Sequence, residues 1–260
     1  MNDLKMTIIQ SNLHWENKEE NLAMFSQKIA AVAESTDLIV LPEMFTTGFS
    51  MQPEKFAETM EDETVNWLKE KARKKNCVIT GSFICEEKGK YYNRLVWMRP
   101  DGRYSTYDKR HLFSMGDENN HYTAGKNKII ETIKGWKICP LICYDLRFPV
   151  WSRTAKTNPY DVLIYVANWP ERRNHPWKTL LLARAIENQS YVIGVNRVGD
   201  DGNQIYHSGD SAVINAKGEI ISKTAAHVEA TETVTLSASE LQEFRKQFPV
   251  LNDADDFKLG

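Results

Sequence analysis

Cys143 stands where a reactive thiol would be useful, at the predicted end of a buried strand. The apolar run Trp136–Cys143 is rich in Ile and Leu, which suits a sheet covered on both faces. Open α/β sheets bind ligands at the carboxyl ends of such strands. A helix beginning just beyond Cys143 would lower the pKa of its thiol and favour the nucleophilic thiolate. Cys143 is therefore a candidate nucleophile; the alternative is a small buried hydrophobe, as most free cysteines are.

Glu43 and Lys109 follow two other predicted strands. Glu43 comes directly after Pro42, which closes an aliphatic run because it cannot donate to a continuing ladder. A carboxylate at such a strand tip suits a general base and acid. Lys109 follows a β-prone stretch, and an ammonium held in a pocket can stabilise an oxyanion. Each residue alone fits a solvated loop charge, but three complementary groups at strand ends predict one hydrolytic site.

The elements that would position these groups alternate along the first half of the chain. The predicted strands span residues 6–10, 37–41, 77–83, 92–98, 104–107, 136–143, 162–167, 191–198, 211–214 and 233–236. Amphipathic helices are predicted over residues 18–33, 63–75 and 176–189, because apolar residues recur there at helical spacing. Tight-turn sequences at 99–102 and 215–218 predict hairpins. The pattern predicts an α/β fold with mixed strand pairing and no dividing linker.

Three segments resemble the signature segments of the nitrilase (carbon–nitrogen hydrolase) superfamily. They are Leu41-Pro42-Glu43, the run Asp-Lys-Arg-His-Leu-Phe at 108–113, and the run Cys-Tyr-Asp-Leu-Arg-Phe-Pro at 143–149. The three together, in order, are far more specific than any one, and the resemblance extends from Thr7 to about Val234. It implies a single-domain, four-layer αββα sandwich. It also implies a catalytic triad of Glu43, Lys109 and Cys143.

Residues 113–125 are similar to the ω-amidase branch of this superfamily. Its members hydrolyse the terminal amide of short dicarboxylate monoamides such as 2-oxoglutaramate. Glu118 matches a second, structural glutamate that many members place beside the triad. The resemblance therefore implies that Glu118 orients Lys109 or shares a proton network with it.

Asn168 and Trp169 end another aliphatic strand and should reach the same edge of the sheet as Cys143. Trp169 would form a wall of the pocket, and Asn168 would donate or accept a hydrogen bond near it. Plain packing explains both residues equally well at this stage.

Arg172 and Arg173 are candidate clamps for a substrate carboxylate, because a guanidinium binds a carboxylate in a bidentate manner. The sequence does not choose between them. Arg147 is expected to pair with Asp145 or another acid and to fix the turn after Cys143.

The predicted mechanism is acyl transfer through a thioester. Glu43 takes the proton of Cys143, whose sulfur attacks the amide carbonyl. Lys109 and the backbone N–H of Tyr144 stabilise the oxyanion. Glu43 then protonates the leaving ammonia and activates water to release the acid.

The composition agrees with a soluble enzyme and points to neither a nucleic-acid nor a membrane partner. Lys and Arg number 33 against 35 Asp and Glu, so no strong field points to either kind of partner. No leader and no apolar stretch of bilayer length is evident, which predicts a cytoplasmic protein with free thiols. The histidines and cysteines lack metal-ligand spacing, and no phosphate loop is present, so neither a metal nor a cofactor is expected.

The chain is predicted to consist of a carbon–nitrogen hydrolase domain, residues 1–236, and a C-terminal helix and tail, residues 237–260. The helix begins at the capping-box sequence Ser237-Ala-Ser-Glu240, and the acidic tail from Asn252 is expected to be loose unless a partner subunit holds it. The resemblance implies a homodimer or a higher homo-oligomer.

Three other functions stay open at this stage. A nitrilase or an N-carbamoyl amidohydrolase would use the same triad on another substrate. A non-catalytic scaffold would be expected to have lost one of the three groups, and all are present. A thiol redox sensor would need a resolving partner for Cys143, and Cys139 should sit inside the strand with poor geometry for a disulfide.

Overall fold

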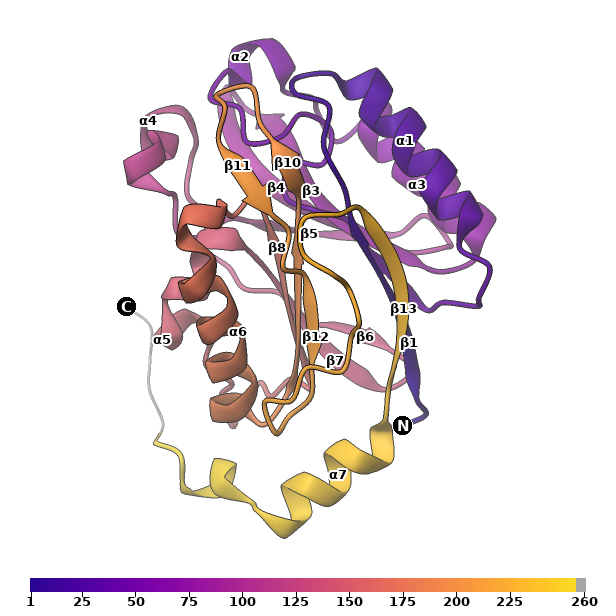
Figure 1. Ribbon diagram of the computed structural model, residues 1–260, viewed down its shortest axis with the longest axis vertical. Coiled ribbons are helices and arrows are strands. Elements are labelled where there is room, and N and C mark those ends of the chain that lie inside the picture. Colours follow the sequence, from indigo (N-terminus) through magenta and orange to yellow (C-terminus); the bar gives the residue numbers. More distant parts are fainter. Residues whose placement is uncertain (256–260) are drawn as a thin grey trace.

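Two β-sheets lie face to face, and helices cover their outer sides (Figure 1). The computed structural model describes residues 1–255. Over this range the first sheet has the strand order β13 (Ala230–Leu236), β1 (Leu4–Gln10), β2 (Leu38–Val40), β3 (Val78–Glu87), β4 (Lys90–Met98) and β5 (Tyr104–Asp108). The second has the order β12 (Ala212–Ile214), β9 (Tyr191–Asn196), β8 (Val162–Ala167), β7 (Trp136–Ile142) and β6 (Glu131–Ile133). This is the predicted four-layer αββα architecture.

The remaining elements are a small ribbon and the helices. The ribbon pairs β10 (Val198–Asp200) with β11 (Tyr206–Ser208). The α-helices are α1 (Lys18–Ala31), α2 (Pro53–Phe56), α3 (Glu63–Lys75), α4 (Glu118–His121), α5 (Pro149–Ser152), α6 (Asn174–Asn188) and α7 (Ala238–Gln247). The 3-10 helices are η1 (Ser114–Gly116), η2 (Cys143–Arg147), η3 (Glu171–Arg173) and η4 (Val250–Asp253).

Parallel strands form the middle of each sheet. In the first sheet β1, β2 and β3 are parallel, and in the second β7, β8 and β9 are. Antiparallel strands flank both sets. A parallel pair needs a crossover, which α1 and α3 supply in the first sheet, and α5 and α6 in the second. Parallel strands therefore end together at one edge of each sheet, where loops can gather reactive side chains.

The alternation of side chains along β2 shows how the layers are held together. Leu38 and Val40 point into the core between the two sheets, whereas Ile39 and Leu41 pack under α1 and α3. On the helix side, α1 contributes Phe25 to this second core. Both faces of the strand are thus covered, which explains why its sequence is a continuous apolar run.

The predicted helix over residues 63–75 and the predicted strand over residues 162–167 have the same bounds in the structure. The strand predicted to end at Cys143 stops one residue earlier, because Cys143 has a φ of 43°. The hairpin predicted at residues 215–218 forms its turn but only an isolated bridge between Ile214 and Ile220. Several short elements were missed: β6, β10, β11, α2, α4, α5 and the 3-10 helices.

The C-terminal helix α7 caps as predicted, because Ser237 accepts a hydrogen bond from the backbone N–H of Glu240. Ala238 and Leu241 bury its inner face in the core between the sheets. Its packing on a partner subunit stays a prediction. The predicted loose tail begins within η4, and its last part, residues 256–260, lies outside the described residues.

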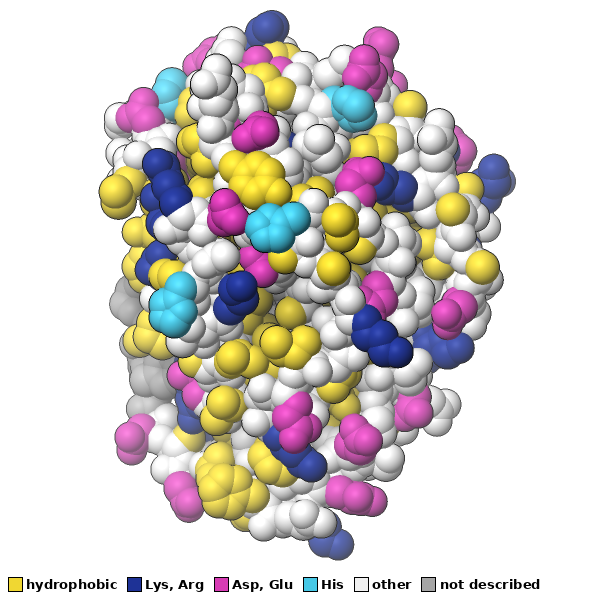
Figure 2. All heavy atoms as spheres, viewed as in Figure 1, with side chains coloured by type: hydrophobic (Ala, Val, Ile, Leu, Met, Phe, Trp, Pro, Cys, Tyr) yellow, Lys and Arg dark blue, Asp and Glu magenta, His cyan; other side chains and the backbone are white. Residues whose placement is uncertain are grey.

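The surface carries both signs of charge. On the face shown in Figure 2, Lys and Arg side chains are interspersed with Asp and Glu. Within residues 1–255, no helix has the length and apolarity needed to cross a membrane. The same range holds no cluster of three or more His, Cys, Asp or Glu side chains arranged to hold a metal ion.

At Gly194, side chains of α6 pack directly against the backbone of the second sheet. A Cβ built there would lie 2.6 Å from Leu181 and 2.8 Å from Trp177. We expect Gly194→Val to lower the free energy of unfolding by about 1–3 kcal/mol, because the added methyls overpack this contact. Urea unfolding measures it. Thr235→Val, on an exposed strand position, is the control and should change it by less than about 0.5 kcal/mol. Equal effects of the two substitutions would contradict this packing argument.

Candidate active site

Glu43, Lys109 and Cys143 lie at the carboxyl ends of strands in both sheets. Glu43 follows β2, Lys109 directly follows β5, and Cys143 is the first residue of η2 after β7. Because the two sheets face each other, these ends meet at one edge of the sandwich. The structure therefore brings together three groups that are far apart in sequence; their catalytic role is a proposal argued below.

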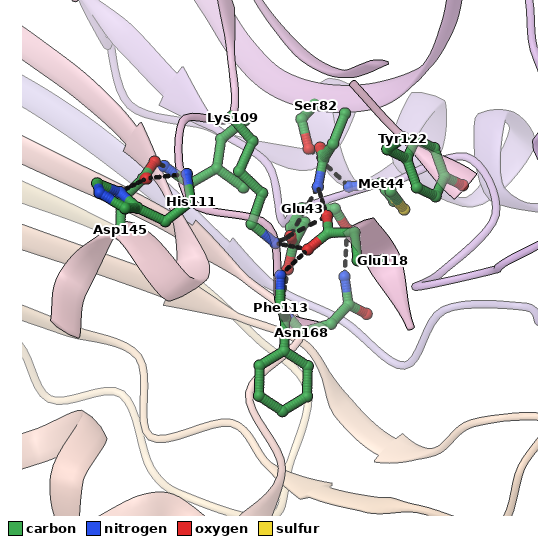
Figure 3. A network of polar contacts seen from close by, with 12 residues as sticks. Glu43, Met44, Ser82, Lys109, His111, Phe113, Glu118, Tyr122, Asp145 and Asn168 are labelled. Carbon is green, nitrogen blue, oxygen red and sulfur yellow. Dashed lines mark hydrogen bonds and ion pairs between the residues drawn. The ribbon is translucent and has the colours of Figure 1, made fainter. Parts of the chain in front are cut away.

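The ammonium of Lys109 lies between two buried carboxylates (Figure 3). Its Nζ donates to Glu43 Oε1 at 2.8 Å and to the two oxygens of Glu118 at 3.0 and 2.9 Å. None of the three side chains is exposed. Burial by itself lowers the pKa of Lys109, but the charges of Glu118 and Glu43 outweigh it and raise that pKa overall. Lys109 is thus a permanently charged group.

Glu118 is the counter-ion of Lys109. Burial raises the pKa of the Glu118 carboxyl, and the Lys109 charge opposes that rise. The carboxyl also accepts hydrogen bonds from the backbone N–H of Phe113 at 2.6 Å and from Asn93 Nδ2 at 3.3 Å. All of these partners are donors, so both oxygens act as acceptors, as an ionised carboxylate does. Glu118 therefore lies beside Lys109, as the resemblance implies.

Two asparagines hold Glu43 in place. Asn93 Nδ2 donates to Glu43 Oε1 at 2.8 Å, and the backbone N–H of Asn168 donates to Oε2 at 2.8 Å. Asn168 Nδ2 also donates to the backbone carbonyl of Glu43 at 2.6 Å. The sequence analysis missed Asn93. The one signal available was its place inside a predicted strand, where asparagine is uncommon.

The Cys143 thiol is buried beside Glu43 and Lys109. Burial, and next the charge of Glu43, raise its pKa well above the usual thiol range, although Lys109 opposes the shift. A short helix does begin here, but the expectation of a lowered thiol pKa is wrong, because burial and the carboxylate outweigh the few N–H groups of η2. The resting thiol is protonated, so its attack requires a neighbouring base.

A cavity of about 240 Å³ opens beside Cys143. Lys109 also lines it, as do all the residues predicted to bind substrate: Tyr144, Asn168, Trp169, Arg172 and Arg173. Glu43 and Glu118 lie behind this lining. The sequence analysis missed several wall residues, which come from loops and from the β10–β11 ribbon: Phe49, Met51, Phe113, Met115, Gly116, Pro170, Asp201, Asn203, Ile205 and His207.

Three arginines line the same cavity: Arg147, Arg172 and Arg173. Within residues 1–255 none of the three guanidinium groups makes an ion pair. The Arg147 guanidinium lies 5.0 Å from the centroid of the Trp169 ring, and that of Arg173 lies 5.0 Å from the centroid of Phe113. Burial, and next the charges of Arg172 and Arg147, lower the pKa of Arg173. Asp201 lines the same cavity, so three arginines against one aspartate give this wall a net positive charge that a ligand could neutralise.

The expected pairing of Arg147 with Asp145 is wrong. The Asp145 carboxylate is taken up by Tyr107, His111 and the backbone N–H of Ile142. Arg147 instead turns over Trp169 toward the cavity. It joins Arg172 and Arg173 as a candidate for binding a carboxylate.

The raised pKa of Cys143 predicts that little thiolate forms where an ordinary thiol ionises, at about pH 8.5. Burial and Glu43 favour the neutral thiol, so the thiolate fraction at any pH is below that of a free cysteine. Thiolate absorbance at 240 nm, as the difference between wild type and Cys143→Ala across the pH range, measures it. Wild type unfolded in urea is the control. A titration step for Cys143 with its midpoint at or below the usual pKa of a thiol would contradict the prediction.

Comparisons with known proteins agree with this geometry. The family model described as carbon–nitrogen hydrolase matches residues 5–246. The chain is 47% identical to the ω-amidase YafV of Escherichia coli K12 over 259 residues, which cover 100% of each protein. It is 31% identical to the 2-oxoglutaramate amidase of Bacillus subtilis 168 over 255 residues, 96% of this chain and 98% of that protein.

Among solved structures, XC1258 from Xanthomonas campestris is similar over the full length. It is described as a CN-hydrolase superfamily protein with an arsenic adduct in the active site. It has a TM-score of 0.97 and 42% identity, with 100% of both chains covered. Together, the family match, the curated relatives and this fold lead to one conclusion: the chain belongs to the carbon–nitrogen hydrolase family.

Proposed function

We propose that this protein is an ω-amidase, which hydrolyses the terminal amide of a small dicarboxylate monoamide such as 2-oxoglutaramate to the acid and ammonia. The observation that carries the proposal is the cavity itself. It presents Cys143 and Lys109 to a carbonyl, and three arginines that make no ion pair within residues 1–255 line its wall. The ω-amidase and 2-oxoglutaramate amidase relatives support the same substrate class.

Acylation begins with a proton transfer inside the buried cluster. Glu43 takes the thiol proton of Cys143, and the sulfur forms a bond to the carbonyl carbon of the amide. The carbonyl oxygen becomes an oxyanion, which the Lys109 ammonium and the backbone N–H of Tyr144 stabilise. Tyr144 lies in the first turn of η2, where backbone N–H groups lack intrahelical partners. The raised pKa of Cys143 makes the adjacent base essential to this step.

The leaving group departs with the proton that Glu43 carries. The C–N bond breaks, ammonia leaves, and the acyl group stays on Cys143 as a thioester. Glu43, again ionised, takes a proton from water, and the resulting hydroxide attacks the thioester carbonyl. The acid is released when the C–S bond breaks, and the sulfur recovers its proton from Glu43. Glu118 and Asn93 keep Lys109 and Glu43 in place throughout.

The substrate carboxylate would bind at the arginines. A guanidinium that faces an apolar ring is held flat and keeps its N–H groups free for a bidentate contact with a carboxylate. Arg173 faces Phe113 and Arg147 faces Trp169 in this way. A substrate with an amide at one end and a carboxylate at the other would satisfy both ends of the cavity.

A nitrilase or an N-carbamoyl amidohydrolase could use the same three groups, and the unpaired arginines favour the ω-amide. Ammonia release from a panel of ω-amides, nitriles and carbamoyl compounds tests this. The proposal requires the highest kcat/KM for an ω-amide that carries a free carboxylate. A thiol sensor fits less well, because Cys139 is fully buried inside β7 and burial raises its pKa to about 12.

The proposal includes a homodimer or higher homo-oligomer and a cytoplasmic location. Exposed apolar side chains on α5 and α6, among them Val150 and Ile186, offer surface for self-association. The four cysteines are free and buried, which fits a reducing compartment.

Cys143→Ala should abolish ammonia release while the fold persists, because alanine removes the nucleophile and little volume. We expect a loss of kcat of at least about 10⁴-fold, since every later step depends on the thioester. Acid quenching of wild type during turnover should trap an acyl adduct on Cys143, seen by intact mass. Ammonia release by Cys143→Ala, in a preparation free of host amidases, would overturn the mechanism.

Arg173→Gln and Arg147→Gln should weaken the reaction of carboxylate-bearing amides. Loss of a hydrogen bond to a charged group costs about 1.5–3 kcal/mol, so kcat/KM should fall about 10- to 100-fold for at least one variant. An amide of the same length without the carboxylate should show little change. Arg103→Gln, which replaces an exposed arginine outside the cavity, is the matched control. Equal losses for the charged and the neutral amide would exclude a carboxylate clamp at these positions.

A further inference from the structure

Asp145 is a buried carboxylate that the proposed mechanism does not use. Its side chain is fully buried, and it does not line the cavity. No Lys or Arg pairs with it among residues 1–255; its ionisable partners there are His111 and Tyr107. An isolated buried carboxylate is costly unless hydrogen bonds satisfy it. The hydrogen-bond partners of Asp145 therefore indicate its role.

Four hydrogen bonds converge on the two oxygens of Asp145. Oδ1 accepts from the backbone N–H of His111 at 3.0 Å and from His111 Nδ1 at 2.8 Å. Oδ2 accepts from the Tyr107 hydroxyl at 2.6 Å and from the backbone N–H of Ile142 at 3.1 Å. The short contact to a carboxylate oxygen assigns a proton to Nδ1.

These donors flank the two reactive residues that belong to different sheets. Tyr107 and His111 lie two residues before and two after Lys109, whereas Ile142 directly precedes Cys143. One carboxylate thus ties the strand end that carries Lys109 to the strand end that carries Cys143. Figure 3 shows Asp145 and His111 on the side of Lys109 away from Glu118.

The donors are themselves held rigidly. The Tyr107 hydroxyl accepts from Trp151 Nε1 at 3.0 Å and from the backbone N–H of Arg110 at 3.2 Å. The His111 ring stacks on Phe148 with ring centroids 3.7 Å apart and planes 8° apart. None of these groups can rotate away without losing a hydrogen bond. The network around Asp145 therefore fixes the segments that supply its donors relative to one another.

Cys143 needs such a support. Its φ of 43° lies in the left-handed region, which a residue with a side chain adopts only when its surroundings hold it there. The bond from Ile142 N–H to Asp145 closes the turn on the residue before it. We propose that Asp145 is a positioning residue: through His111 and Ile142 it fixes Cys143 against the Lys109–Glu43 pair. The inference rests on the proposed amide hydrolysis, in which the sulfur must meet both groups.

Asp145→Asn is the direct test, because it keeps shape and volume. An amide NH₂ facing Ile142 would leave that backbone N–H without an acceptor. Turned the other way, it would leave the backbone N–H of His111 without one. Either orientation releases one of the two backbone ties. We expect kcat to fall about 10²-fold or more, as for a misplaced reactive group, with KM within about threefold of wild type.

Glu58→Gln is the matched control. Glu58 is also a buried carboxylate that accepts a backbone N–H, from Thr64 at 3.0 Å, but its partners Thr64 and Lys18 belong to α3 and α1 and not to the segments that carry Lys109 and Cys143. The kcat of Glu58→Gln should stay within about twofold of the wild-type value. Thermal unfolding and circular dichroism of both variants measure the fold separately from the activity.

The alkylation rate of Cys143 by iodoacetamide gives a readout that needs no substrate. It should be slower in Asp145→Asn than in wild type, since Glu43 no longer faces the thiol correctly. If wild type hydrolyses no amide at all, the proposed function fails, and this rate still tests the positioning role.

The pair His111→Ala and His111→Asn covers the case in which Asp145→Asn does not fold. An asparagine amide nitrogen can take the place of Nδ1. We therefore expect the kcat of His111→Asn to be at least about tenfold higher than that of His111→Ala. A folded Asp145→Asn with kcat and alkylation rate within threefold of wild type would overturn the proposal. If Asp145→Asn does not fold, the proposal would be overturned by a kcat that is equal in His111→Ala, His111→Asn and wild type.

Discussion

The site depends on one constraint: the charge of a fully buried ammonium must be compensated by neighbouring carboxylates. Lys109 meets it with two carboxylates, Glu43 and Glu118. Removal of one partner from a buried ion pair costs about 3–5 kcal/mol, so the cluster fixes the loops that supply it. Glu118 in turn needs the backbone N–H of Phe113, and Glu43 needs Asn168. The positions of four separate segments follow from one charge.

The different roles of the Glu118 and Glu43 carboxylates follow from their surroundings. Glu118 is saturated by donors and faces away from the cavity, so it stays the counter-ion of Lys109. Glu43 lies nearer Cys143, whose raised pKa keeps the proton on sulfur until substrate arrives. The thiol is thus less reactive toward other electrophiles than a thiolate would be. A thiolate formed by a helix terminus would lack that protection, since it would be present in the resting enzyme.

Strand ends could be predicted from the sequence because apolar runs stop at polar residues, and this located Glu43, Lys109 and Cys143. Asn93 could not be predicted, because its partners lie 50 and 25 residues away and its own strand gives no period that marks it. The role of Asp145 was misjudged for the same reason. Its neighbour Arg147 looked like a partner, but the two side chains that bind it, Tyr107 and His111, are 38 and 34 residues away. The local sequence pattern predicts helices and strands. The partners of a buried side chain depend instead on how the two sheets pack against each other.

The cavity separates its charges along its length, and this separation orients a ligand. Lys109 is neutralised by the carboxylates behind it, whereas Arg147, Arg172 and Arg173 have no such partner among residues 1–255. An anionic group is therefore drawn to the arginines rather than to Lys109. That leaves Lys109 free for the weaker dipole of a carbonyl, whose charge grows only as the sulfur attacks. In the proposed reaction, the ion pairs of Lys109 at this edge would also keep a substrate carboxylate out of the oxyanion site.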